Sequence, residues 1–199
     1  MSNKKISNRY DFSIISEWIE QDYKVLDLGC GDGGLLNFLK KEKNITGYGI
    51  EKDDENWLKS LKNGINVIQM DLETGLSGFE KNSFDIVILS KTIQSMHNIE
   101  IILDEMLRVG KEIIVTFPNF GYWRNRFQMI SGSMPISKEL PYAWFNTPNI
   151  HLCTIDDFDQ FCQKKRFKVL DKLILTNNKA IQFMPNLFGA LVLYKLISK

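Results

Sequence analysis

The stretch VLDLGCGDGG, residues 25–34, contains the clearest fold signal in the sequence. It begins with a short run of branched apolar residues, which is typical of a buried strand. Gly29, Gly31 and Gly33 follow at once, and glycine lets a chain turn tightly and lets a ligand approach the backbone. Gly29, Gly31 and Gly34 also have the G-x-G-x-x-G spacing of a strand, a turn and a helix. The stretch therefore predicts the first strand of an α/β sheet, followed by a ligand-binding turn.

Short apolar runs alternate with helical patterns through the first two-thirds of the chain. Continuous apolar strands indicate a parallel sheet covered by helices on both faces. One predicted helix ends at Gly64, and another ends at Gly110, a residue that can take the left-handed C-cap conformation. Such an alternation predicts a Rossmann-like α/β fold with ligands at the carboxyl ends of the strands. The predicted strands cover residues 24–29, 45–51, 65–71, 84–90 and 112–117.

The last part of the chain follows a different pattern. A helix is predicted after Thr154, with Asp157 placed to complete a capping box. Two strand patterns then follow, within residues 167–175 and 188–197, and no helical pattern separates them. Successive strands pair most easily in the antiparallel sense. The sheet is therefore predicted to be mixed and to end in a hairpin.

Residues 118–150 form a long connection that contains four of the five prolines. They show little periodicity beyond a helix around residues 121–131. Connections of this length in compact domains are usually lids or binding loops. We predict a single domain over residues 1–199, decorated by this aromatic and proline-rich segment.

The composition excludes several classes of protein. With 25 basic and 24 acidic residues the net charge is +1, so no long-range field marks a nucleic-acid or membrane binder. No apolar run reaches the roughly 18 residues of a spanning helix, and MSNKKISNRYDF lacks the apolar core of a secretory signal. Three widely spaced cysteines suit free thiols. We expect a cytoplasmic protein without a metal site.

Acidic residues at the predicted strand ends identify the ligand class. Asp27 would repel a pyrophosphate but suits a ligand with an ammonium and a sulfonium, as in S-adenosylmethionine (SAM). Glu51 is placed to accept hydrogen bonds from ribose hydroxyls, which NAD would also require. Asp71 suits an adenine amino group. The candidate residues for SAM or S-adenosylhomocysteine (SAH) are Asp27, Gly29, Cys30, Gly31, Gly33, Glu51, Asp71, Leu72 and Ser90.

The stretches VLDLGCGDGG, GIE, MDL and FDIVILSKTIQ resemble the class I methyltransferases. This resemblance implies a seven-stranded, mostly parallel sheet with an antiparallel last strand. The stretches SMHN, EMLRVGK, FPNFGYWRNRFQ and MPISKELPYAWFNTPNIHLCTIDDF are more specific and resemble the MetW family of methionine-biosynthesis proteins. That resemblance implies an accessory role beside homoserine O-acyltransferase, the enzyme called MetX.

Two further sets of residues carry hypotheses about function. His97, after the fourth strand, is the candidate base if the chain transfers methyl groups, although a histidine there also suits helix capping. A small-molecule methyltransferase is the alternative function, and a nucleic-acid methyltransferase ranks third. Aromatic rings and arginines between residues 118 and 150 suit a lid or a partner surface, which would couple ligand binding to association. This set comprises Phe120, Tyr122, Trp123, Arg124, Arg126, Phe127 and Trp144.

Overall fold

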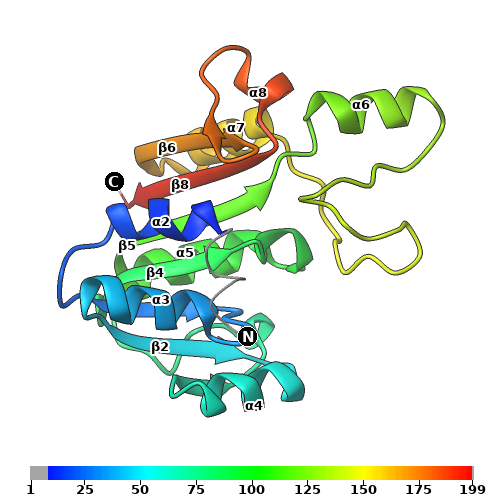
Figure 1. Cartoon of the computed structure of the whole chain (residues 1–199). Helices are drawn as coiled ribbons and strands as arrows, with labels where there is room; N and C mark the ends of the chain where they lie inside the picture. The colour runs from blue at the N-terminus through cyan, green and yellow to red at the C-terminus, as the bar shows by residue number, and fades with distance from the viewer. Residues whose placement is uncertain (1–8, 199) are drawn as a thin grey trace. The chain divides into compact units, whose positions relative to one another are not determined.

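The computed structural model describes residues 9–198 (Figure 1). The prediction that the chain lacks a secretory signal concerns residues 1–12, and residues 1–8 lie outside the described part. The described chain divides into two units. The first unit runs to Ser90 and includes Asn98–Ile114; the second consists of Lys91–His97 and the chain from Val115 onwards. No helix within residues 9–198 has both the length and the apolar character needed to cross a membrane.

Parallel strands form the centre of the first unit. Strand β1 pairs in parallel with β2 and β4, and β2 pairs in parallel with β3. The apolar runs of β1 and β4 form strands whose side chains are mostly buried, four of five residues in β1, whereas the edge strand β3 has none buried. The predicted strands are therefore confirmed, with no end shifted by more than two residues. The strands are β1 Lys24–Leu28, β2 Thr46–Glu51, β3 Asn66–Gln69 and β4 Phe84–Ser90.

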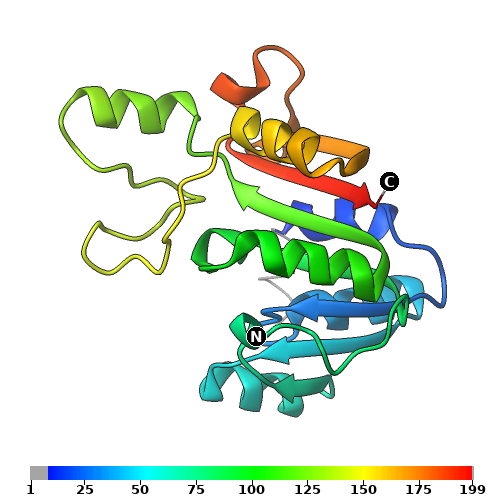
Figure 2. The same cartoon turned by 180° about the vertical axis from the view of Figure 1, so that it is seen from behind.

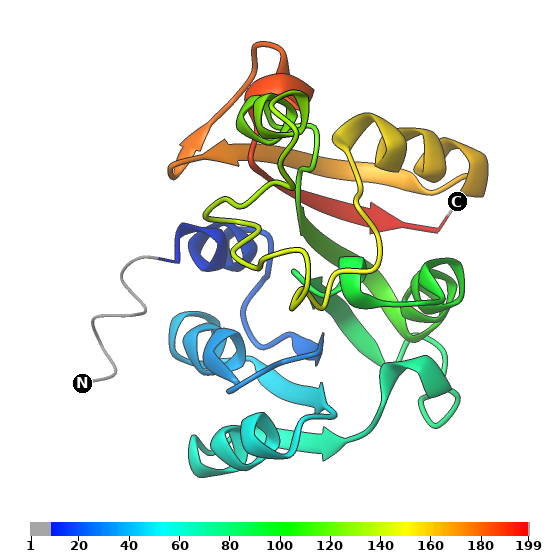
Figure 3. The same cartoon turned by 90° about the vertical axis from the view of Figure 1, so that its right-hand side faces the viewer.

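Helices cover both faces of this parallel sheet (Figure 3). Helices α2, α3 and α4, blue to cyan, lie on one side, and the green α5 lies on the other. Helix α5 buries Ile102, Leu103, Met106 and Val109, which recur at the spacing of one helical face. The helices are α2 Tyr10–Glu17, α3 Gly34–Lys43, α4 Asp54–Lys62 and α5 Ile99–Val109, with a short 3-10 helix η1 Leu72–Thr74.

The two glycines predicted to end helices do so for different reasons. Gly64 follows α4 in the left-handed region, with a φ of 73°. Gly110 ends α5 with a φ of −102°, so the expected left-handed C-cap is wrong there. A Cβ at Gly110 would lie 2.7 Å from a methyl carbon of Val87 and 2.9 Å from the Glu112 carbonyl oxygen. Gly110 therefore allows β5 to start without a gap against β4.

The second unit contains the antiparallel end of the sheet (Figure 2). Strand β5, Gly110–Pro118, continues from the first unit into this one, and the strand order continues β5-β8-β6-β7. Strand β6, Lys168–Thr176, pairs antiparallel with both β8, Leu191–Ile197, and β7. The predicted terminal hairpin is confirmed. The other elements are β7 Lys179–Ala180, the 3-10 helix η2 Ile93–Ser95, α6 Trp123–Ile130, α7 Ile155–Lys165 and α8 Pro185–Phe188.

Within residues 9–198 the sheet has eight strands, so the expected count of seven is wrong. The additional strand is β7, which has two residues, both exposed. Asn177 and Asn178 adopt positive φ values of 51° and 63°, and two such residues form the tight turn that suits a hairpin. A strand of two exposed residues leaves no apolar pattern in the sequence. Helix α8 has only four residues, so it also left no helical pattern in the sequence.

Asn119, directly after β5, joins the irregular segment to the rest of the second unit. Its side chain is fully buried and uses both of its polar atoms. The amide group donates to the carbonyl oxygens of Asn186 at 3.0 Å and Gly189 at 2.8 Å. The amide oxygen accepts from the N–H groups of Gly121 at 3.0 Å and Ile155 at 3.3 Å. One side chain thus fixes the start of residues 118–150 against α7 and α8.

Replacing Asn119 tests this role. Asn119→Ala leaves buried backbone donors and acceptors without partners, which costs about 1–3 kcal/mol for a single group, so we expect unfolding free energy to fall by about 3 kcal/mol. Urea unfolding followed by circular dichroism measures it. Asn146→Ala, at an exposed position, is the matched control and should change stability by less than about 0.5 kcal/mol. Equal losses in both variants would contradict the role of Asn119.

Candidate functional site

The glycine turn after β1 is attached to the end of β2. Gly29, Gly31 and Gly33 all have positive φ values, of 70°, 58° and 75°. The N–H groups of Gly29 and Cys30 both donate to the carbonyl oxygen of Ile50, at 2.8 and 3.0 Å. Residues with side chains rarely adopt such φ values. Because three of the five residues 29–33 have them, the sequence is rich in glycine here.

Gly31 and Gly33 serve different purposes within the turn. A Cβ at Gly33 would lie 2.7 Å from a carbon of Ile65 and 3.0 Å from the Ser60 hydroxyl, so this glycine allows close packing at the start of α3. A Cβ at Gly31 would meet nothing within 4 Å. Open space beside a backbone that only glycine adopts easily is what a ligand lying against the turn would require.

Glu51, the last residue of β2, joins its own strand end to the glycine turn. Its Oε2 accepts from the N–H of Gly31 at 2.8 Å, and its Oε1 accepts from the N–H groups of Lys52 and Asp53, both at 2.9 Å. A carboxylate offers about four acceptor positions, so three contacts leave capacity for a further donor. Glu51 is therefore held in place while it keeps room for a ligand hydroxyl.

Asp27 lies on β1 and is 2% exposed. Burial and, to a smaller extent, the negative charge of Glu51 raise the pKa of this carboxyl, and the positive charge of Arg9 lowers it, so that the pKa lies at about 8. The guanidinium of Arg9 also forms two hydrogen bonds of 2.9 Å with Asp11. An anionic Asp27 is costly in this environment, so a cationic ligand would gain by compensating its charge.

The remaining cofactor candidates contribute in different ways. Asp71 caps η1 by accepting from the Glu73 N–H at 3.0 Å, and its side chain stays 44% exposed, 3.5 Å from the Lys52 ammonium. Leu72 is buried, and Ser90 is the half-buried last residue of β4. All nine candidates belong to the first unit, at or next to strand ends and the glycine turn.

Cys30 turns its thiol into the protein. Its sulfur lies 3.9 Å from the hydroxyl of Ser60 on α4, and burial raises the pKa of the thiol to about 12. Ser60 also donates to the Gly31 carbonyl oxygen at 2.8 Å, which supports the turn from α4. Sequence reasoning missed Ser60 and Arg9. Leu58 and Leu61 of α4 are 47% and 44% exposed, whereas Ser60 is buried, so the apolar pattern of this helix did not mark Ser60.

In the second unit, the predicted aromatic set divides into buried and exposed members. Tyr122 is buried at 8% exposure, whereas Trp123, Phe127 and Trp144 are 42%, 66% and 74% exposed. His97, the candidate base, is exposed and directly precedes Asn98, the residue before α5. Its catalytic role remains a prediction.

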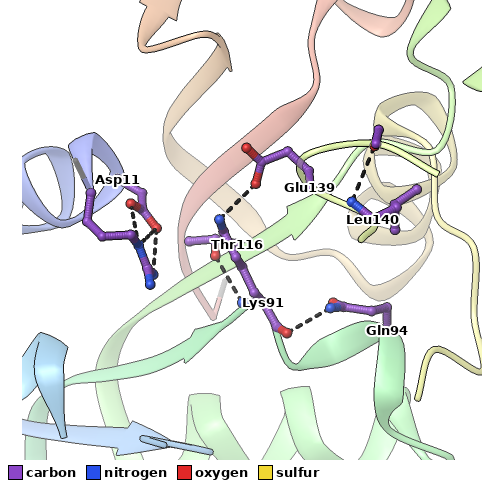
Figure 4. Close-up of polar contacts among 8 residues, drawn as sticks. Asp11, Lys91, Gln94, Thr116, Glu139 and Leu140 are labelled. Carbon is purple, nitrogen blue, oxygen red and sulfur yellow. Dashed lines mark hydrogen bonds and ion pairs between the residues drawn. The ribbon is translucent and has the colours of Figure 1, made fainter. Parts of the chain in front are cut away.

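A polar cluster around Lys91 fixes the far part of residues 118–150 (Figure 4). Lys91 has a φ of 55°, uncommon for a residue with a side chain, and its N–H donates to both the carbonyl and hydroxyl oxygens of Thr116. Its ammonium pairs with Glu139 at 2.8 Å. The side-chain amide of Gln94 donates to the Lys91 carbonyl oxygen. The backbone carbonyl oxygen of Gln94 accepts from the N–H groups of Ile150 and His151. Sequence separation hid this cluster.

Comparison with known proteins identifies the family. The family model described as methionine biosynthesis protein MetW matches residues 9–196. The chain belongs to the MetW family. A relative from Rhodopirellula baltica, named bifunctional methionine biosynthesis protein MetXA/MetW, is 39% identical over 162 residues. The match covers 76% of this chain, and the chain spans 26% of the length of that relative.

The MetW-family chain shares its fold with solved methyltransferase structures. A SAM-dependent methyltransferase from Thermotoga maritima is 18% identical, with 98% of this chain and 91% of the other covered and a TM-score of 0.68. Magnesium protoporphyrin IX methyltransferase from Synechocystis, solved with bound SAH, is 12% identical, with 98% and 83% covered and a TM-score of 0.65. At these identities the likeness shows the fold alone.

Two other groups of polar residues in this MetW-family chain are its cysteines and the predicted capping box. All three cysteines are free, and burial raises the pKa values of Cys153 and Cys162 to about 12, so both thiols are weak nucleophiles. Within residues 9–198 no group of three or more His, Cys, Asp or Glu side chains is placed to hold a metal ion. The predicted capping box of Thr154 and Asp157 is confirmed at the start of α7.

Alanine at two glycines of the turn tests the division of roles. Gly31→Ala should cost about 1 kcal/mol of unfolding free energy, because alanine disfavours a positive φ. Gly33→Ala should cost about 1–3 kcal/mol more, because its methyl group overlaps Ile65. Urea titration compares both with Gly78→Ala, a control with open space and no positive φ. Equal stability of the Gly31 and Gly33 variants would contradict the packing role of Gly33.

The buried carboxyl of Asp27 predicts a pH dependence of stability. Its pKa rises from 3.8 in an unfolded chain to about 8 in the folded protein, so between these values the folded state binds the extra proton. Unfolding free energy should therefore fall as pH rises from 5 to 8, by at most about 1.4 kcal/mol per pH unit from this group. Asp27→Asn should flatten the slope in urea titrations at pH 5, 6, 7 and 8. Equal slopes for the wild type and Asp27→Asn would show that Asp27 is already ionised in the folded protein at pH 5.

Proposed function

We propose that this chain is an accessory protein of methionine biosynthesis that binds SAM or SAH in its first unit, and associates with and activates homoserine O-acyltransferase (MetX). The observation that carries the proposal is the Rhodopirellula baltica relative, whose name joins MetXA and MetW in one bifunctional protein. Two functions that share a chain in one organism are expected to work side by side where they are separate chains. SAM occupancy is proposed as the signal that adjusts this association.

The cofactor part of the proposal is supported by the chemistry of the first unit. A buried carboxyl at Asp27 favours a ligand with positive charge, and SAM has both an ammonium and a sulfonium. Glu51 keeps an acceptor position for a ribose hydroxyl, and the exposed carboxylate of Asp71 suits the adenine amino group. When bound, SAM supplies an activated methyl group, but an accessory role requires only that its presence be sensed.

The aromatic residues of the second unit are proposed as the partner surface. Trp123, Phe127 and Trp144 are exposed, and Trp, Phe and Arg side chains are enriched among residues that anchor protein interfaces. Phe120 and Tyr122 are less exposed and are proposed to support this surface from below.

A small-molecule methyltransferase is the second candidate. The observation that favours it is the fold shared with SAM-dependent methyltransferases. His97, exposed beside the start of α5, is then the proposed base. This candidate requires transfer of a labelled methyl group to some acceptor in a cell extract, with loss of transfer in His97→Ala.

Acyltransferase activity tests the proposal directly. Homoserine O-acyltransferase from the same organism would be purified alone and after co-expression with this chain. We expect the two proteins to copurify and the activity to rise at least several-fold, with the gain changing as SAM is titrated. Absence of copurification and of any activity change would overturn the accessory function, and a labelled acceptor would then favour the methyltransferase.

A further inference from the structure

Helix α6 presents an apolar stripe to solvent. Trp123, Phe127 and Ile130 recur at the i, i+4, i+7 spacing that places side chains on one helical face. Their exposed fractions are 42%, 66% and 85%. Amphipathic helices normally bury such a stripe, as α5 does with its own apolar residues. An exposed stripe of large side chains on a helix marks a surface that another molecule covers.

The opposite side of α6 is fixed within the second unit. Asn125 is 2% exposed, and its amide donates to the carbonyl oxygen of Asn119 at 3.2 Å. Gln128 accepts from the N–H of Ile136 at 3.0 Å and donates to its carbonyl oxygen at 3.2 Å, which braces the helix against the returning chain. These contacts hold the stripe in one orientation. A surface that is already ordered loses less entropy when it binds.

The charged residues of α6 and of the chain next to it have one sign. Residues 119–137 contain two arginines, Arg124 and Arg126, and no aspartate or glutamate. Arg124 is exposed, and its guanidinium carbon lies 5.4 Å from the Trp123 ring centre, so charge and aromatic surface are presented together. A complementary partner has carboxylates around an apolar depression.

We infer that the outer face of α6 docks in an apolar groove, bordered by carboxylates, on the acyltransferase partner. This inference rests on the proposed function, and it specifies which part of the aromatic set makes the contact. A helix that inserts its i, i+4 and i+7 side chains into a groove is a recurrent mode of protein recognition. Trp and Arg supply a large share of binding energy in such contacts. Tyr122 and Asn125, on the inner side, support the helix and do not meet the partner.

Substitutions on the stripe test the inference. The double variant Phe127→Ser/Ile130→Ser should weaken binding to the purified acyltransferase at least about ten-fold, because it removes two large apolar side chains that the complex would bury. Arg124→Glu should weaken binding most at low salt, because salt screens exposed charges. Ile101→Ser on α5, where the side chain is 59% exposed, is the matched control and should bind like the wild type. Calorimetry measures affinity, and thermal unfolding confirms that each variant folds.

Each outcome separates the inference from the function on which it rests. If folded stripe variants bind and activate the acyltransferase like the wild type, the docking surface is wrong and the accessory function stands. If the wild type itself does not bind the acyltransferase, both the docking surface and the accessory function are wrong. The stripe could instead bind a second copy of this chain, and sedimentation of the wild type and of the double variant tests this. If the substitutions change only self-association, the stripe binds a second copy and the inference is overturned.

Discussion

The carboxylate of Glu51 is the constraint on which the first unit depends. It receives the N–H of Gly31 from the turn after β1 and those of Lys52 and Asp53 from the turn after β2. Two loops that belong to different strands are therefore held by a single side chain. A charged acceptor strengthens each of these bonds, and its burial makes the loss of any of them costly. The open space beside Gly31 exists because this arrangement holds the turn in place.

The second unit uses the same principle with a neutral side chain. Asn119 fixes the start of residues 118–150 through four hydrogen bonds, and the Lys91 cluster fixes their far part. A segment with one helix and four prolines is thus ordered from both ends. This explains how a connection with little regular structure can present large exposed rings, a combination that suits binding between proteins better than a packed core.

Much of the fold was predictable from the sequence because its signals are local. The apolar runs of β1 and β4, the periodic stripe of α5 and the capping box at Thr154 are each contained within about a dozen residues. The acids at strand ends were predictable because parallel strands bring their carboxyl ends to one edge. The position of Glu51 at the end of a strand could be predicted, but its hydrogen bond with the N–H of Gly31 could not.

The features that the sequence did not reveal depend on distant residues. Lys91 and Glu139 are 48 positions apart, and Asn119 meets residues 67 and 70 positions away. A side chain at position 110 would overlap Val87 on the neighbouring strand, and β7 is too short to leave a pattern. Whether an aromatic ring is buried or exposed is also a tertiary property, so Tyr122 and Phe127 look alike in the sequence and differ in the structure.

A crystal structure of this chain with SAH would show whether the glycine turn and the acids at the strand ends build a nucleoside site. We expect SAH against Gly31, with a ribose hydroxyl donating to Glu51 and the ammonium near Asp27. A structure that shows SAH elsewhere, or none at saturating concentration, would rule out this site.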